Sequence, residues 1–101
     1  MQVKILYFSG CPNWQKAAER TRTALVELGR GDVALELEDA QGMAHLPHGW
    51  AGSPTVLVDG RDPFAERNLA ASRDACRMYR TATGLEGAPG VDELRRALDG
   101  D

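Results

Sequence analysis

The sequence is poor in cysteine and in long apolar runs, and it has no excess of positive charge. Its 101 residues include two cysteines, too few for a disulfide framework, and a reducing compartment would keep an isolated pair as thiols. No run reaches the roughly 18 apolar residues that a membrane-spanning helix needs. The net charge of −3 is unlike the basic patch of most nucleic-acid-binding proteins. We therefore expect no disulfide framework, no membrane association and no nucleic-acid partner.

The N-terminus also lacks the features of a targeting segment. Met1-Gln2-Val3-Lys4-Ile5 enters a strand-like pattern directly, without a basic region, a long apolar stretch or a small-residue cleavage site. This predicts a cytoplasmic protein. The length of 101 residues leaves room for one hydrophobic core, so a single domain over residues 1–101 is expected.

Several signatures of functional sites are absent as well. The chain has no phosphate-binding glycine loop, no nucleotide fingerprint and no paired carboxylates with an evident common placement. Asp59-Gly60-Arg61-Asp62 starts like a calcium loop but lacks the other ligands, so a turn is the preferred interpretation. Arginines occupy positions 61, 67, 73, 77 and 80. This local positive charge either attracts a small anion or simply forms a solvated face.

What the sequence does contain is an alternation of strand and helix patterns. Residues 3–8 are almost continuously apolar, as in a strand buried on both faces. Helical periodicity then runs from Pro12 to a stop near Gly29 or Gly31. Residues 33–38 alternate apolar and charged, which suits an edge strand. Strand, helix and strand in this order predict a βαβ unit with parallel strands.

The second half of the chain predicts further strands and a closing helix. The expected elements, in order, are a short helix and loop over 40–51 anchored by Met43 and Leu46, a central strand over 55–58 closed by a turn at Asp59-Gly60, one or two helical turns around Leu69 within 62–75, an outer strand over 77–81, and a helix over 91–98. The outer strand is expected to return antiparallel to residues 55–58. These elements predict an α/β fold with a mixed four-stranded sheet, βαβ followed by ββα, and both long helices packed against it.

Cys11 is the leading candidate for a reactive group, because it sits where the first strand ends and the first helix is expected to begin. Free backbone N–H groups and the positive end of the helix dipole favour a thiolate over a thiol at such a position. Pro12 suits the first helical turn, where its missing N–H is no loss. The alternative is that Cys11 is a small buried apolar residue, as free cysteines commonly are.

Three segments of the chain resemble the thioredoxin-like superfamily. They are Gly10-Cys11-Pro12-Asn13-Trp14, Ser53-Pro54-Thr55, and Gly87 shortly before the C-terminal helix, and the resemblance covers nearly the whole chain. It implies a glutaredoxin- or thioredoxin-type fold in which the Ser53–Pro54 peptide bond is cis and faces Cys11. Proline lacks a backbone donor, so Pro54 leaves a position at the head of its strand where an extended substrate can pair with the neighbouring residues.

Trp14 departs from the superfamily pattern. Dithiol members have a second cysteine there and many single-thiol relatives have serine, so redox turnover here would need an external thiol or Cys76 as a candidate second thiol. If Cys76 opens the outer strand, it lies about 16 Å from Cys11, beyond the roughly 7 Å that a disulfide spans, and a buried structural role is preferred. Trp14 is either a core residue or a platform for an apolar ligand beside the thiol.

His45 and His48 lie in the loop that leads to Pro54. Together with Cys11 they offer ligands for zinc or a softer metal, but their spacing matches no metal signature, and two surface histidines explain them as well. A further hypothesis is that His48 donates a hydrogen bond to a Cys11 thiolate. No cofactor is predicted, with glutathione or another external thiol as the candidate reductant.

These features lead to two functional hypotheses. The first is a single-cysteine thiol–disulfide oxidoreductase-like protein in which Cys11 attacks a thiol or disulfide substrate, such as a protein or peptide. The second is a non-catalytic binding module that holds a peptide, a thiol ligand or a soft metal, and the tryptophan in place of a second thiol favours it. The candidate binding residues around Cys11 are Pro12, Trp14, Ser53, Pro54 and Thr55.

Overall fold

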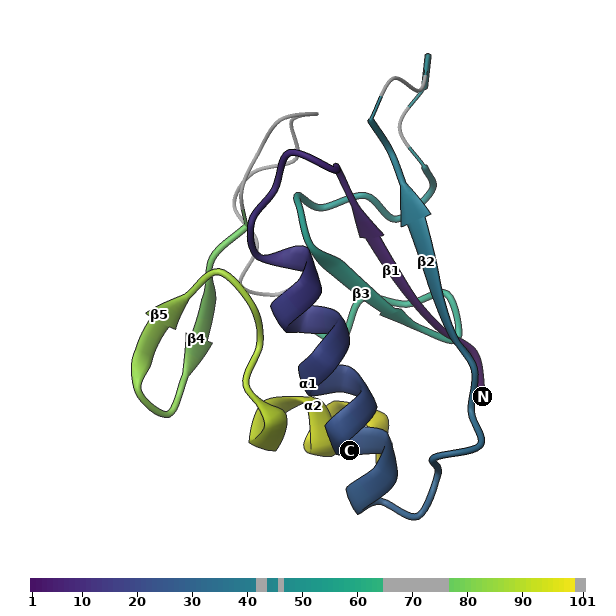
Figure 1. Cartoon of the computed structure of the whole chain (residues 1–101), viewed down its shortest axis with the longest axis vertical. Coiled ribbons are helices and arrows are strands. Elements are labelled where there is room, and N and C mark those ends of the chain that lie inside the picture. The colour runs from purple at the N-terminus through teal and green to yellow at the C-terminus, as the bar shows by residue number, and fades with distance from the viewer. Residues whose placement is uncertain (42–43, 46, 65–76, 100–101) are drawn as a thin grey trace.

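The computed structural model describes residues 1–41, 44–45, 47–64 and 77–99, and these residues form a mixed α/β arrangement (Figure 1). Its elements in chain order are β1 (Val3–Tyr7), α1 (Trp14–Glu27), β2 (Leu35–Asp39), β3 (Thr55–Val58), β4 (Tyr79–Thr81), β5 (Gly84–Glu86) and α2 (Val91–Leu98). Neither helix of this described part is long and apolar enough to cross a membrane.

β1 is the central strand of a three-stranded sheet in the order β2-β1-β3. It runs parallel to β2, with Val3 opposite Leu35, and antiparallel to β3, with Val3 opposite Val58. The parallel pair confirms the predicted βαβ unit. The central position follows from the sequence, because β1 has buried side chains on both faces, Ile5 on one and Leu6 on the other.

Both helices pack on one face of this sheet. The main core joins Val3 and Ile5 of β1, Val56 of β3, and the apolar side of α1 to Leu94 and Leu98 of α2, which are fully buried. The two helices also contact each other. The buried residues of α1 lie along one side, as the helical periodicity predicted: they are Ala17, Ala18, Thr21, Ala24 and Leu25.

The opposite face of the sheet carries a smaller apolar cluster of Leu6, Ala40, Trp50 and Leu57. Beside this cluster lies the charged side chain of Lys4, which forms ion pairs with Glu36 and Glu38. The short helix expected between 40 and 51 is not found among the residues described there, which form turns and bends. Met43 and Leu46, its expected anchors, lie outside the described residues.

The end of α1 is set by glycine. Gly29 has φ +73°, and its N–H donates to the Val26 carbonyl while the Arg30 N–H donates to the Leu25 carbonyl. This pair of bonds is the Schellman arrangement, which satisfies carbonyls that the last helical turn leaves open. The predicted stop near Gly29 is therefore confirmed, whereas the helix begins at Trp14 and not at Pro12.

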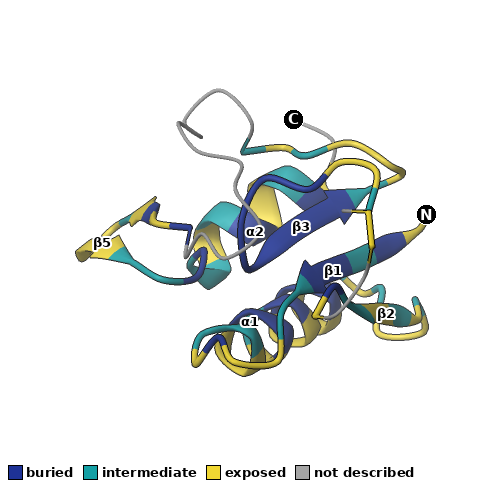
Figure 2. Cartoon of the chain, turned by 90° about the horizontal axis from the view of Figure 1, so that it is seen from above, coloured by how far each residue is buried: buried dark blue, intermediate teal, exposed yellow. Residues whose placement is uncertain are grey.

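The prediction of a four-stranded sheet is wrong for the described residues. β4 pairs antiparallel with β5 in a separate two-stranded hairpin, with Arg80 opposite Leu85, and does not pair with β3. The hairpin extends away from the three-stranded sheet (Figures 1 and 2). β3 is thus an edge strand of the sheet as described, although Thr55, Val56 and Leu57 are buried. The reason for the error is that the sequence 77–86 carries a tight local turn, which satisfies the backbone of 79–81 without β3.

Two smaller predictions concern the turn after β3 and the segment that follows it. The turn after β3 is confirmed, because Asp59 and Gly60 both have positive φ, 52° and 82°, and Val58 and Arg61 exchange backbone hydrogen bonds across them. The helical turns expected around Leu69 lie outside the described residues.

Candidate thiol site

Cys11 lies in the turn between β1 and α1 and is almost fully buried. Its backbone N–H donates to the Phe8 carbonyl at 2.9 Å, and 3% of the residue is exposed. Since α1 begins three residues later, at Trp14, the thiol is not in the first helical turn as predicted, and Pro12 is an exposed residue of the preceding turn. The sulfur instead donates to the Ser53 carbonyl, with Sγ and O 3.6 Å apart.

The strand register explains why Cys11 and Ser53 meet. Leu6 of β1 is opposite Thr55 of β3, so the residues that follow β1 lie beside those that precede β3. The Ser53 hydroxyl accepts the Phe8 N–H at 3.2 Å, which ties the two segments together. The Ser53–Pro54 peptide bond is cis, as the resemblance implied.

Ser53, Pro54 and Thr55, the predicted substrate-docking residues, are fully buried. The Thr55 hydroxyl accepts the Ala51 N–H at 3.1 Å and donates to the Gly52 carbonyl, so it holds the loop before β3 in place. The three residues therefore form a closed, buried segment in which the Ser53 carbonyl contacts the Cys11 thiol.

Trp14 stacks on Tyr7, an aromatic partner that the sequence analysis did not identify. The ring centroids are 4.3 Å apart and the planes differ by 20°. Both residues are half-buried, and they join the first turn of α1 to the end of β1. The stack covers one face of the indole, and the geometry fits the structural role considered for this residue better than that of an open platform.

Arg77 is the most important residue at this site that sequence reasoning missed. Its N–H donates to the Ser53 carbonyl at 2.9 Å, the same oxygen that accepts the Cys11 thiol. Its guanidinium lies 2.6 Å from Asp62 Oδ2 and donates to the Phe64 carbonyl at 2.7 Å. The arginine side chain is 2% exposed, far from the solvated face considered for this arginine-rich stretch.

The other arginines of that stretch behave differently. Arg61 and Arg80 are exposed, whereas positions 67 and 73 lie outside the described residues. An arginine fifteen residues from its carboxylate partner has no local sequence signal. The spacing of Arg77 and Tyr79 on one side of a short strand was the only hint that both side chains share an environment.

The position of Arg77 also corrects the predicted course of residues 77–81. An antiparallel return along β3 would have started beside Val58, but Arg77 starts beside Ser53, at the opposite end of that strand. The distance argument against a Cys11–Cys76 disulfide therefore no longer holds. Cys76 itself lies outside the described residues, and Cys11 is a free thiol.

Tyr79 completes the cluster around Ser53–Pro54. Its hydroxyl donates to the Pro54 carbonyl, and its ring packs edge-to-face on Phe64 at 5.3 Å. The Arg77 guanidinium lies over the same ring, with Cζ 4.6 Å from the centroid. Burial raises the pKa of the Tyr79 phenol well above its usual value, so the hydroxyl keeps its proton and remains a donor.

His45 and His48 are not brought to the thiol. Both are exposed, and within the described residues neither forms a hydrogen bond with Cys11. A search of the same residues finds no group of three or more histidine, cysteine, aspartate or glutamate side chains placed to hold a metal ion.

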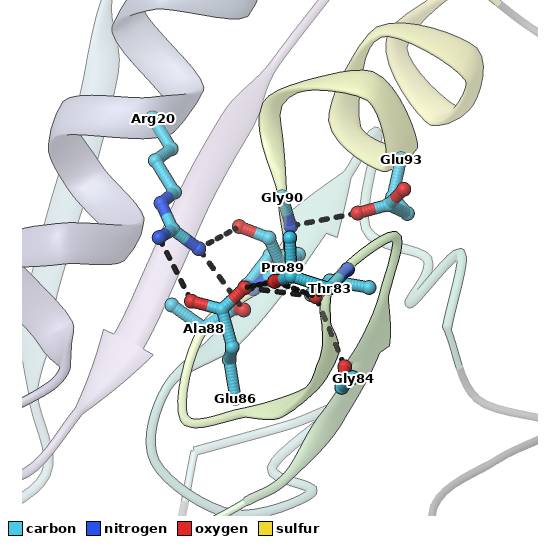
Figure 3. Close-up of polar contacts among 9 residues, drawn as sticks. Arg20, Thr83, Gly84, Glu86, Ala88, Pro89, Gly90 and Glu93 are labelled. Carbon is cyan, nitrogen blue, oxygen red and sulfur yellow. Dashed lines mark hydrogen bonds and ion pairs between the residues drawn. The ribbon is translucent and has the colours of Figure 1, made fainter.

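A second polar cluster lies at the base of the hairpin (Figure 3). Arg20 of α1 pairs with Glu86 at 2.9 Å and donates to the Ala88 and Pro89 carbonyls. Glu86 also accepts the hydroxyls of Thr81 and Thr83. These hydrogen bonds, with the one from Thr81 the largest cause, lower the pKa of Glu86 from 4.5 to about 2.

The two clusters are joined through Asn13 and Gly87. A Cβ at Gly87 would lie 2.1 Å from Asn13 Nδ2, so the segment before α2 presses directly on the residue that precedes α1. The Asn13 side chain makes no capping hydrogen bond to α1. The close atoms all belong to the Asn13 side chain, so a side chain at position 87 would have to displace the Asn13 amide.

Comparisons of the sequence with known protein families, with curated proteins and with solved structures found no match. The site is thus defined by its own geometry: a buried free thiol, the cis Ser53–Pro54 segment and a buried arginine that share one carbonyl oxygen.

Proposed function

We propose that the protein is a cytoplasmic, single-cysteine thiol–disulfide oxidoreductase-like protein with a thioredoxin-like arrangement, in which Cys11 is the reacting group. The observation that carries this proposal is the contact between the Cys11 thiol and the Ser53–Pro54 segment. Three described features agree with the resemblance: the parallel and antiparallel neighbours of β1, the two helices on one face, and the cis bond before Pro54.

The reaction that such a site would carry out is thiol–disulfide exchange. The Cys11 thiolate attacks one sulfur of a substrate disulfide, that S–S bond breaks, and the other sulfur leaves as a thiolate that takes a proton from solvent. An external thiol then attacks the mixed disulfide and releases Cys11. That attack leaves a disulfide between the external thiol and the substrate half. A second external thiol breaks this bond and releases the substrate half as a thiol, so two external thiols become one disulfide for each substrate disulfide reduced.

The deciding experiment is a turnover assay on the full chain, with bis(2-hydroxyethyl) disulfide as substrate and glutathione as the external thiol. We expect wild-type protein to accelerate glutathione oxidation, Cys11→Ser to fall to the uncatalysed rate, and Cys76→Ser to retain activity. With glutathione disulfide in place of the substrate, a mass spectrum of the protein should show one glutathione on Cys11. Absence of any acceleration by the wild type would overturn the enzymatic function.

The second candidate, a binding module for a peptide, a thiol ligand or a soft metal, is favoured by a different observation. Cys11 is 3% exposed and the Ser53 carbonyl already has two donors, so in the described structure the thiol is covered and this carbonyl is not free to pair with a substrate. Under this alternative the protein forms the glutathione adduct at Cys11 but produces no catalytic turnover in the same assay.

A further inference from the structure

The Ser53 carbonyl is the point where the thiol site is closed by the chain itself. It accepts the Arg77 N–H at 2.9 Å and the Cys11 thiol at 3.6 Å. An extended substrate that pairs with the head of β3 needs this same oxygen. Residues 77–79, here called the lock segment, therefore occupy the backbone position that the substrate would take.

Side chains hold the lock segment in this position. The Arg77 guanidinium contacts both oxygens of Asp62, at 2.6 and 3.4 Å, and the Phe64 carbonyl at 2.7 Å. The Tyr79 hydroxyl donates to the Pro54 carbonyl. Arg77 and Tyr79 are each 4% exposed, so these contacts are shielded from water, where a charged pair is strongest.

The lock segment is separable from the main sheet. Tyr79 is the one residue of the lock segment that belongs to a described ladder, opposite Glu86 of β5, so releasing the segment leaves the pairing of β1 with β2 and β3 intact. Proteins open locally in such units when the contacts that hold a segment are few and are distinct from the global core. The Asp62–Arg77 pair supplies the charged contact among them.

We propose that residues 77–79 are an autoinhibitory lock over Cys11, held shut by the buried Asp62–Arg77 ion pair and released by a local opening that frees the Ser53 carbonyl and the thiol together. The lock concerns access to Cys11. It rests on the proposed function only in that the thiol it covers is the reacting group.

The first test uses the wild-type fold in a Cys76→Ser background, so that Cys11 is the one thiol present. The rate of alkylation of Cys11 by iodoacetamide is compared with hydrogen exchange at the Arg77 amide, which donates to Ser53, and at the Ile5 amide of the core. We expect Cys11 and Arg77 to open with the same equilibrium constant within about threefold, and Ile5 to remain protected in low urea. If Cys11 reacts only with the urea dependence of Ile5, the thiol is exposed by global unfolding and the lock is wrong.

The second test breaks the lock. Asp62→Asn, and Asp62→Asn with Arg77→Met to avoid an unpaired buried charge, should raise the alkylation rate of Cys11 about tenfold or more. The matched control is Glu27→Gln, which removes the exposed ion pair with Arg95 between the two helices and should leave the rate within about twofold. An equal increase in the control, or none in either Asp62 variant while circular dichroism shows a folded chain, would contradict the lock. If the variants do not fold, the wild-type comparison alone decides.

The outcomes separate the lock from the proposed function. Faster alkylation in Asp62→Asn with no turnover in the glutathione assay would support the lock and remove the oxidoreductase function. Turnover by the wild type with an unchanged alkylation rate in Asp62→Asn would support the oxidoreductase function and remove the lock.

Discussion

The two arginine clusters of this protein use the same chemistry in different surroundings. At the thiol site the Arg77 and Asp62 side chains are 2% and 9% exposed, whereas Arg20 and Glu86 beneath the hairpin are each 26% exposed. Each arginine also caps backbone carbonyls and ties a loop to the sheet or to a helix. We expect burial, more than the number of hydrogen bonds, to set the cost of breaking each cluster, because water screens the exposed pair and reaches the buried pair far less.

Replacing Arg77 should have the largest effect. Arg77→Met leaves Asp62 buried without a cation, and we expect the free energy of unfolding to fall by about 3–5 kcal/mol. Urea denaturation measures this loss. Arg80→Met, an exposed change in the same hairpin, is the control and should stay within about 0.5 kcal/mol of wild type. Equal losses in the two variants would show that burial of the Arg77 pair is not what stabilises the site.

The second largest effect is expected from Gly87→Ala, where the two clusters are linked. Gly87→Ala places a methyl group against Asn13, and we expect it to lower the free energy of unfolding by about 1–3 kcal/mol. Asn13→Ala combined with Gly87→Ala should recover most of that loss, because the opposing amide is gone. Gly10→Ala, where the nearest atom would be at an ordinary 3.6 Å, is the matched control. Additive losses in the double variant would exclude a direct clash.

The half-exposed cluster should respond to pH. Its Glu86 has a pKa near 2 in the folded chain against 4.5 as the ordinary value, so its stabilising contribution is complete above about pH 4.5 and is lost as the pH falls toward 2. Urea midpoints of wild type and Glu86→Gln should therefore differ at pH 6 and converge near pH 2, and added salt should narrow the difference. A difference that stays constant with pH would contradict this role for the carboxylate.

The smallest effect is expected from breaking the most exposed of the three ion pairs compared, Arg95–Glu27. Arg95 joins α2 to Glu27 of α1 at 3.1 Å, but both side chains are 44% exposed. Arg95→Ala should cost about 0.2–1 kcal/mol, measured by urea denaturation beside Arg22→Ala on the outer side of α1. A loss close to that of Arg77→Met would mean that the helix–helix ion pair is far less screened than its exposure indicates.

Local patterns in the sequence were sufficient for the first half of the fold. The apolar run of β1, the helical spacing after it and Gly29 at its end each act through neighbours in the chain, so their structure follows from residues close by. The same holds for the positive-φ turn at Asp59-Gly60. The pairing of Cys11 with a cis Ser53–Pro54 segment came from the resemblance to the thioredoxin-like superfamily, because sequence patterns alone favour a trans bond before Pro54.

The tertiary structure alone decided what closes the site. The sequence predicted a thiol after β1 and no second cysteine in the motif, while the resemblance implied that the segment before β3 faces that thiol. It did not determine that β4 would turn back onto β5, nor that Arg77 would be buried against Asp62 beside Ser53. Those outcomes depend on contacts between residues far apart in the chain, where charge and alternation fit a solvated strand as well as a buried one, and only the packing of the assembled chain distinguishes the two.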